Sequence, residues 1–257
     1  MKTPGKILPL IAAALLYTSA ACAATVTDSV NIYSADGSLI STCAFSPPEI
    51  KENDPLAQVS ALYLNMKHRR FLQRCKSLET DMNLIYEAWK AGAGENDSFG
   101  KSGSRNSPSA GGKSLQSSGS SYSMTTELFR SPLRKTASLV TKEISSIIGQ
   151  RNVTTYAATF DAATGRRLSL ADAFGGDKAV ADKIAVYVQR YLVASPYKDN
   201  LAPDYNSHVY DFCTGTVEDG WYIDGDNLTV IYPASAITKN HDSELLVTLP
   251  LKELIKI

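Results

Sequence analysis

The chain has 257 residues with 26 basic and 26 acidic side chains, so its formal net charge at pH 7 is zero. It has no clustered basic excess, which excludes the usual electrostatic footprint of a nucleic-acid-binding protein. About 230 residues remain once a leader is removed, which is enough for one large domain or two small ones.

Residues 1–23 are typical of a secretory signal peptide. Lys2 and Lys6 precede a short apolar run at residues 7–16, and small residues lead to an Ala21-Cys22-Ala23 cleavage site. The apolar run is far shorter than the ~20 residues of a membrane-spanning helix, and no later stretch approaches that length. We therefore expect a periplasmic or secreted protein with no transmembrane segment in the mature chain.

A second interpretation of the leader concerns Cys22. Residues 19–22 read SAAC, which resembles the lipoprotein box whose cysteine becomes the lipidated first residue of the mature protein. In that case the protein would be lipid-anchored through Cys22.

Residues 24–91 are expected to form a β-hairpin followed by a long helix. Two runs of alternating hydrophobicity, residues 26–34 and 39–45, flank an Asp36-Gly37 turn, a pattern typical of a hairpin. Residues 46–48, Ser-Pro-Pro, end the second strand.

The long helix has clear start and stop signals. Asp54 suits the N-cap, Pro55 suits the first helical position, and Gly92 follows the last periodic residue. Apolar residues recur at helical spacing in two sets that are out of phase across residues 67–70, so we expect a bend, a break or a coiled-coil-like stutter there. The two sets are Leu56, Val59, Tyr63 and Met66, and then Phe71, Cys75, Leu78, Met82, Ile85 and Trp89.

Three cysteines, Cys43, Cys75 and Cys213, lie after the leader. An oxidising compartment permits one bridge and leaves one thiol, and we predict a disulfide between Cys43 and Cys75. The alternative is that the cysteines are small buried apolar residues. Their spacing matches no zinc-binding pattern.

The second half of the chain differs in composition and in hydrophobic pattern. Residues 92–121 are rich in Gly and Ser and are expected to be a flexible linker or a surface insertion. Residues 122–257 are rich in strand patterns and include an amphipathic helix near residues 177–195. Because strands and helices are segregated along the chain, we expect an α+β fold with an antiparallel sheet, a long N-terminal helix and a second amphipathic helix.

Two blocks in this second half resemble a bacterial family. Residues 156–174 read YAATFDAATGRRLSLADAF, and residues 221–233 read WYIDGDNLTVIYP. Both are similar to blocks of the RsiV-like extracytoplasmic domain of unknown function, which also occurs beside the deacetylase domain of PdaC-type cell-wall enzymes. The resemblance implies that residues 122–257 form an RsiV-like domain. It further implies a non-catalytic binding or sensing role in the cell envelope, with a cell-wall-active protein such as lysozyme as a candidate partner.

No ligand site is carried over from that family, because the turn before Tyr156 and the segment after Pro233 depart from its pattern. The residues themselves suggest an acidic, aromatic stretch in which aromatic side chains would anchor a basic protein and carboxylates would steer its approach. The alternative is a pair of ordinary turns with acids facing water and aromatics facing the core. The candidate ligand-binding residues are Asp204, Tyr205, Tyr210, Asp211, Glu218, Asp219, Trp221 and Tyr222.

Motifs of catalysis are missing from the sequence. It contains no G-x-S-x-G, and His68, His208 and His241 lie far apart and outside any H-E-x-x-H motif. We therefore expect no catalytic residues, no metal site and no cofactor. Two alternative functions remain: an envelope glycan-modifying enzyme, which needs two carboxylates about 5 to 9.5 Å apart, and a structural protein that dimerises through the residue 71–89 stripe.

Overall fold

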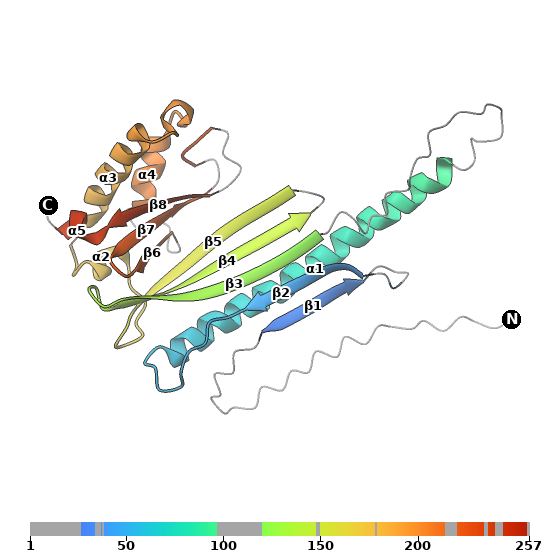
Figure 1. Cartoon of the computed structure of the whole chain (residues 1–257), viewed down its shortest axis with the longest axis horizontal. Helices are drawn as coiled ribbons and strands as arrows, with labels where there is room; N and C mark the ends of the chain where they lie inside the picture. Colours follow the sequence, from blue (N-terminus) through green and yellow to red (C-terminus); the bar gives the residue numbers. More distant parts are fainter. Residues whose placement is uncertain are drawn as a thin grey trace.

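The computed structural model combines helices with two β-sheets, which confirms the expected mixture of helices and strands (Figure 1). Among the described residues no helix is both long and apolar enough to cross a membrane. The predicted leader, residues 1–23, lies outside the described residues. The structure describes residues 27–33, 37, 39–96, 120–147, 150–177, 179–213, 220–233, 236–239 and 244–255.

The larger sheet has five strands in the order β1-β2-β3-β4-β5. Neighbouring strands are antiparallel except for β2 and β3, which are parallel, so the expectation of a purely antiparallel sheet is wrong at this pair. The reason is the connection: the chain crosses the sheet through a long helix before it returns as β3, and parallel neighbours require such a crossover. The strands are β1 (Asp28–Tyr33), β2 (Leu39–Ser46), β3 (Ser120–Ser131), β4 (Thr136–Ile147) and β5 (Gln150–Asp161).

The crossover helix is α1 (Ala57–Asn96), which extends past the expected end at Gly92. Asp54 caps its start, because its side-chain Oδ1 accepts a hydrogen bond from the Leu56 N–H at 3.0 Å. The helix is continuous across residues 67–70, so the phase shift in the apolar pattern is a stutter rather than a break. The buried positions of this segment are Leu56, Ser60, Tyr63, Lys67, Phe71, Cys75, Leu78 and Met82.

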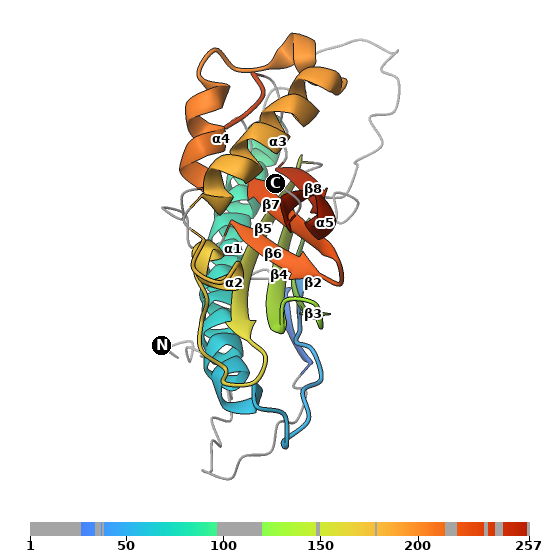
Figure 2. The ribbon, with the colours of Figure 1, turned by 90° about the vertical axis from the view of Figure 1, so that its left-hand side faces the viewer.

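The smaller sheet is antiparallel, in the order β6-β7-β8, and packs on the face of the larger sheet opposite α1 (Figure 2). Ile231 packs on Val140 and Ala157, and the Ile223 N–H donates a hydrogen bond to the Ser138 hydroxyl at 3.1 Å. The strands are β6 (Trp221–Asp224), β7 (Asn227–Tyr232) and β8 (Leu245–Pro250).

A helical layer covers the far face of the smaller sheet. Val188 and Leu192 of α3 lie in one core with Val230 of β7, while Ile231, the next residue of β7, faces the larger sheet. The layers are therefore α1, the larger sheet, the smaller sheet, and α3 with α4 (Figure 1 and Figure 2). The remaining elements are α2 (Leu170–Ala173), α3 (Val180–Ala194), η2 (Lys198–Asn200), α4 (Tyr205–Cys213) and α5 (Leu251–Ile255).

Candidate functional site

The path of α1 over the larger sheet leaves one corner of that sheet without an apolar cover. The start of α1, with Leu56 and Tyr63, packs on Leu139 of β4 and Phe160 of β5. Its later turns pack instead on β1, β2 and β3, where Phe71 and the residues after it meet an apolar cluster. The far ends of β4 and β5 are therefore exposed beside the helix.

This corner is polar because the pattern of β4 and β5 changes along the strands. Alternate residues of a strand share a face, so the positions that follow Leu139 toward α1 are Thr141, Glu143 and Ser145. In the register of the sheet, Glu143 lies opposite Thr154, and Ser145 lies opposite Asn152. We call Glu143, Ser145, Asn152 and Thr154, together with Arg70 and Arg74 of α1, the polar corner.

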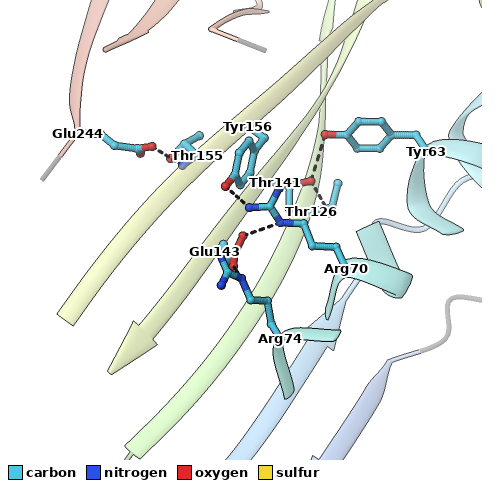
Figure 3. Close-up of polar contacts among 9 residues, drawn as sticks. All are labelled: Tyr63, Arg70, Arg74, Thr126, Thr141, Glu143, Thr155, Tyr156 and Glu244. Atoms are coloured by element: carbon cyan, nitrogen blue, oxygen red, sulfur yellow. Dashed lines mark hydrogen bonds and ion pairs between the residues drawn. The ribbon is translucent and has the colours of Figure 1, made fainter. Parts of the chain in front are cut away.

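Glu143 is the central charge of the polar corner, and its side chain is only 9% exposed. The Nε atom of Arg70 lies 3.2 Å from Glu143 Oε2, and the Nε atom of Arg74 lies 3.4 Å from Oε1 (Figure 3). Arg70 and Arg74 are one helical turn apart, so both reach the same carboxylate from one face of α1. The carboxylate is thus neutralised in place, as a nearly buried charge must be.

Tyr156 lies next to the polar corner on the edge strand β5. Its hydroxyl accepts a hydrogen bond from Arg70, and the Arg70 guanidinium lies 4.5 Å from the centre of its ring (Figure 3). The ammonium group of Lys67 lies 4.3 Å from the same ring centre and 5.0 Å from that of Tyr63. Burial raises the pKa of Tyr156, and the negative charge of Glu143 raises it further, so Tyr156 remains a neutral hydroxyl.

A small pocket opens beside the polar corner, with a volume of about 280 Å³. Burial, followed by the charge of Glu143, raises the pKa of Tyr122, a residue that is only 4% exposed. The Tyr122 hydroxyl lies near Glu143 but makes no aligned hydrogen bond with any described residue. The pocket is lined by Arg74, Ser77, Leu78, Asp81, Tyr122, Glu143, Ser145, Ile147, Asn152 and Thr154.

Glu244 forms a separate polar contact on the other side of β5. Its Oε1 accepts a hydrogen bond from the Thr155 N–H at 2.5 Å, which connects the residue before β8 to the free edge of the larger sheet (Figure 3). Burial raises the pKa of the Glu244 carboxyl, while the bonds from Thr155 oppose that shift.

The eight residues predicted to bind a ligand do not form one patch. Trp221 is 4% exposed and belongs to the core, so its expected role as a surface anchor is wrong. Tyr222 stacks on Phe129 between the two sheets, with ring centres 5.5 Å apart. Glu218 and Asp219 lie outside the described residues. Trp221 is buried and Tyr222 is half-buried because the short strand has a sheet on one side and helices on the other.

The other predicted residues come together at α4. Asp204 lies 3.3 Å from His208 one turn later, and Tyr205 packs against the core of the helical layer. The hydroxyl of Tyr210 lies close to the Asp182 carboxylate of α3, which raises the pKa of Tyr210. Asp211 is exposed next to it. This part of the predicted stretch therefore lies on the surface of the helical layer.

The exposed side of α3 adds apolar residues to this surface. Asp182, Val186 and Val193 are four and seven residues apart, so they lie on one side of the helix. Val186 is 45% exposed, Val193 is 56% exposed, and Tyr210 is 49% exposed. We call Asp182, Val186, Val193, Asp204, Tyr210 and Asp211 the acidic helical face.

Cys43 of β2 and Cys75 of α1 lie side by side in the core as free thiols. Their thiols are hydrogen-bonded to each other, and this contact together with burial raises the pKa of Cys75. The pair joins the helix to the sheet at the position where a disulfide was predicted. The side chain of Cys213 lies outside the described ones.

Sequence reasoning missed the polar corner. A local signal beside it was Lys67, a basic residue at a position where the apolar stripe of α1 requires a buried side chain. Glu143 carried a weaker signal, because it interrupts the inward-facing positions of a central strand. Comparison with known protein families and with curated proteins finds no match to this chain.

Proposed function

We propose that this protein is an exported, non-catalytic binding domain of the cell envelope that docks a basic, cell-wall-active protein such as lysozyme on its acidic helical face. The observation that carries this proposal is the contact between Tyr210 and Asp182, which places aromatic, acidic and apolar side chains of α3 and α4 on one surface.

The chemistry of this surface suits a basic protein partner. Val186 and Val193 offer exposed apolar area for a contact core, and Tyr210 offers an aromatic anchor. Carboxylates at the margin attract a cationic protein and raise its association rate, an effect that falls as the salt concentration rises.

The resemblance to the RsiV-like family supports the proposal that this is a binding domain of that kind, because residues of the first block form a turn and a helix start in this fold. Asp161 Oδ1 accepts hydrogen bonds from the Ala163 and Thr164 N–H groups at 3.0 and 2.7 Å, which builds the turn after β5. Ser169 and Asp172 then form a capping box at the start of α2. Two proteins that share a fold but bind different ligands are expected to keep the residues that form its turns and helix starts.

The second block supports the same class. β6 and β7 form a hairpin around Gly225 and Asp226, and β8 and α5 follow. This is the order of strand, Asp-Gly turn, strand and closing elements that the resemblance implies.

The two alternative functions have less support. The residue 71–89 stripe would serve a dimer only if it were exposed, but Phe71, Cys75, Leu78 and Met82 are buried against the larger sheet. Trp89 lies outside the described side chains. For an enzyme that modifies glycans, the polar corner offers Glu143, whose carboxylate is already engaged by two arginines.

The test is a binding titration of the mature chain with lysozyme at moderate salt. The double variant Asp204→Lys/Asp211→Lys should weaken binding by about tenfold or more, because it reverses the charge of the docking surface. The matched control is Glu49→Lys/Glu52→Lys, which makes the same charge change on the exposed approach to α1. Equal weakening by both variants, or no saturable binding by the wild-type chain, would contradict the proposal.

A further inference from the structure

We propose that the pocket of the polar corner binds a single pyranose ring of a neutral sugar. The pocket is lined by residues of α1, β3, β4 and β5. The helices α3 and α4, which carry the acidic helical face, lie beyond the smaller sheet (Figure 1 and Figure 2), so the two proposals do not depend on each other.

The size of the pocket fits one sugar ring. Its volume of about 280 Å³ equals that of about nine waters at about 30 Å³ each. This is just below the range of about 300–1,000 Å³ that is typical of ligand pockets, so the pocket suits a ligand the size of one ring. An extended glycan would therefore place one residue inside and leave the remainder in solvent.

Two buried polar groups at the base of the pocket point to a ligand that forms hydrogen bonds. The Tyr122 hydroxyl makes no aligned hydrogen bond with a described residue, and neither does Glu143 Oε2, which contacts Arg70 only as an ion pair. Tyr122 is 4% exposed and Glu143 is 8% exposed. A buried hydroxyl without an aligned hydrogen bond is costly, so a bound hydroxyl group that accepts from Tyr122 would remove that cost, and it could donate in turn to Glu143 Oε2, which is ion-paired with Arg70 but accepts no aligned hydrogen bond.

The charges around the pocket favour a neutral ligand. Glu143 and Asp81 are acidic, while Arg74 lines the wall and Arg70 lies directly behind Glu143. An anionic ligand would meet the Asp81 and Glu143 carboxylates, and a cationic ligand would meet the Arg74 guanidinium and find Glu143 already paired with Arg70 and Arg74. Neither charge is favoured, which leaves a molecule that is rich in hydrogen-bonding groups but carries no net charge.

The remaining wall has the mixed character that a sugar ring requires. Ser77, Ser145 and Thr154 supply hydroxyl groups, and Asn152 supplies an amide that both donates and accepts. Leu78 and Ile147 supply an apolar surface for the C–H groups of the ring. Such a set of alternating donors and acceptors beside a small apolar patch matches vicinal hydroxyl groups on a pyranose.

Two sources of this chemistry exist in a cell envelope: neutral hexoses, and the N-acetylated hexosamines of the wall. The probes are therefore glucose and N-acetylglucosamine, each titrated into the ¹⁵N-labelled mature chain and followed by NMR. We expect saturable shifts of the backbone amides of β4 and β5 with at least one sugar. Stronger binding of N-acetylglucosamine would assign the ring to the wall glycan, and stronger binding of glucose would assign it to a neutral hexose.

Two variants locate the binding. Asn152→Ala and Thr154→Val each remove a hydrogen-bonding side chain from the pocket wall without opening the core, and each should weaken binding about three- to tenfold. The matched control Thr248→Val removes the same hydroxyl from an exposed position of β8 and should leave the affinity unchanged. The absence of saturable shifts with both sugars would overturn the proposal, as would equal affinities of wild type and both pocket variants. Neither result would affect lysozyme binding, which is measured separately with variants of α4.

Discussion

The ammonium group of Lys67 lies 4.3 Å from the centre of the Tyr156 ring, at a position of α1 that is only 4% exposed. The guanidinium group of Arg70 lies 4.5 Å from the same ring centre. One aromatic side chain of the edge strand β5 therefore contacts two cations from consecutive turns of the helix. This cluster lies where α1 changes its packing partners. The apolar residues of α1 that precede Lys67 contact β4 and β5, and those that follow Arg70 contact β1, β2 and β3.

The Tyr156 ring should contribute more to stability than the Tyr156 hydroxyl. Replacement by Leu removes both cation–π contacts and should lower the free energy of unfolding by about 2–3 kcal/mol. Replacement by Phe keeps the ring and removes only the acceptor for Arg70, at a cost of about 0.5–1.5 kcal/mol. Urea unfolding of the two variants measures the difference. Tyr33→Leu, at a position that is 50% exposed, should cost less than either, and equal losses for Phe and Leu at position 156 would argue against a role for the ring.

The sequence explains the stutter of α1 only in part. The cap at Asp54 and the apolar spacing are local signals, and both correspond to features of the helix. The phase shift at residues 67–70 arises because Lys67 occupies a buried position of the stripe. The buried residues from Tyr63 to Cys75 are then spaced four apart, with Lys67 and Phe71 between them. A pattern that counts only apolar residues omits Lys67, and its aromatic partner on β5 is distant in sequence.

The sheet pairing and the sites depend on contacts that no local pattern contains. The parallel pairing of β2 with β3 follows from the crossover of α1, and the burial of Trp221 follows from the helices that pack over β6. The polar corner combines residues of α1, β4 and β5. By contrast, Asp204, Tyr210 and Asp211 lie close together in the sequence, so a local pattern groups these three residues of the acidic helical face.

Cys43 and Cys75 should form a disulfide when the protein is exported into an oxidising compartment. Oxidation would join the two thiols with the loss of two protons and two electrons to a thiol oxidant or a disulfide donor of that compartment. The loop between them spans 32 positions in sequence, and closing it in the unfolded chain should add about 3–4 kcal/mol to the free energy of unfolding.

Thiol titration of the denatured chain measures the bridge, with Cys213→Ser as the background so that only the pair is counted. The melting temperature should fall on addition of a reductant, and the Cys43→Ala/Cys75→Ala variant should not respond to it. Two titratable thiols in protein purified from the periplasm, with no effect of reductant, would show that the pair is a reduced core contact.

Glu244 should make stability depend on pH. Its folded-state pKa is raised by burial above the ordinary value of 4.5, so its contribution to stability is fully present below about pH 4.5 and is lost as the pH rises through the folded-state pKa. Glu244→Gln keeps a carbonyl acceptor for the Thr155 N–H and removes the charge. We expect this variant to be more stable than wild type at pH 7 and the difference to shrink toward pH 4.

Urea unfolding at several pH values provides the measurement. Glu127→Gln, at a side chain of β3 that is 50% exposed, is the control and should change stability little at any pH. A Glu244→Gln variant that is less stable than wild type at pH 7 would mean that the ionised carboxylate is favoured by its hydrogen bonds more than it is penalised by burial.

Gly165 should be required for the contact between the turn after β5 and the start of α1. Its φ angle is +70°, and a Cβ atom at this position would lie 3.1 Å from Val59 Cγ2 and 3.3 Å from the Pro55 carbonyl oxygen. Gly175 has a similar φ of +74° but no atom within 4 Å of the added Cβ. Gly175→Ala therefore measures the backbone strain alone, about 1 kcal/mol, and Gly165→Ala should cost about 2–3 kcal/mol because the helix must also move.

Urea unfolding of the two variants separates these two effects, since the strain is common to both. A larger loss for Gly165→Ala means that the glycine of the first family-like block is needed for close packing on α1, a segment that precedes the block by about a hundred residues in sequence. Residues 122–257 and the N-terminal helix would then fold as one unit, because a glycine in the first is required by its contact with the second. Equal losses would instead limit the role of Gly165 to the turn itself and leave the two segments free to vary independently.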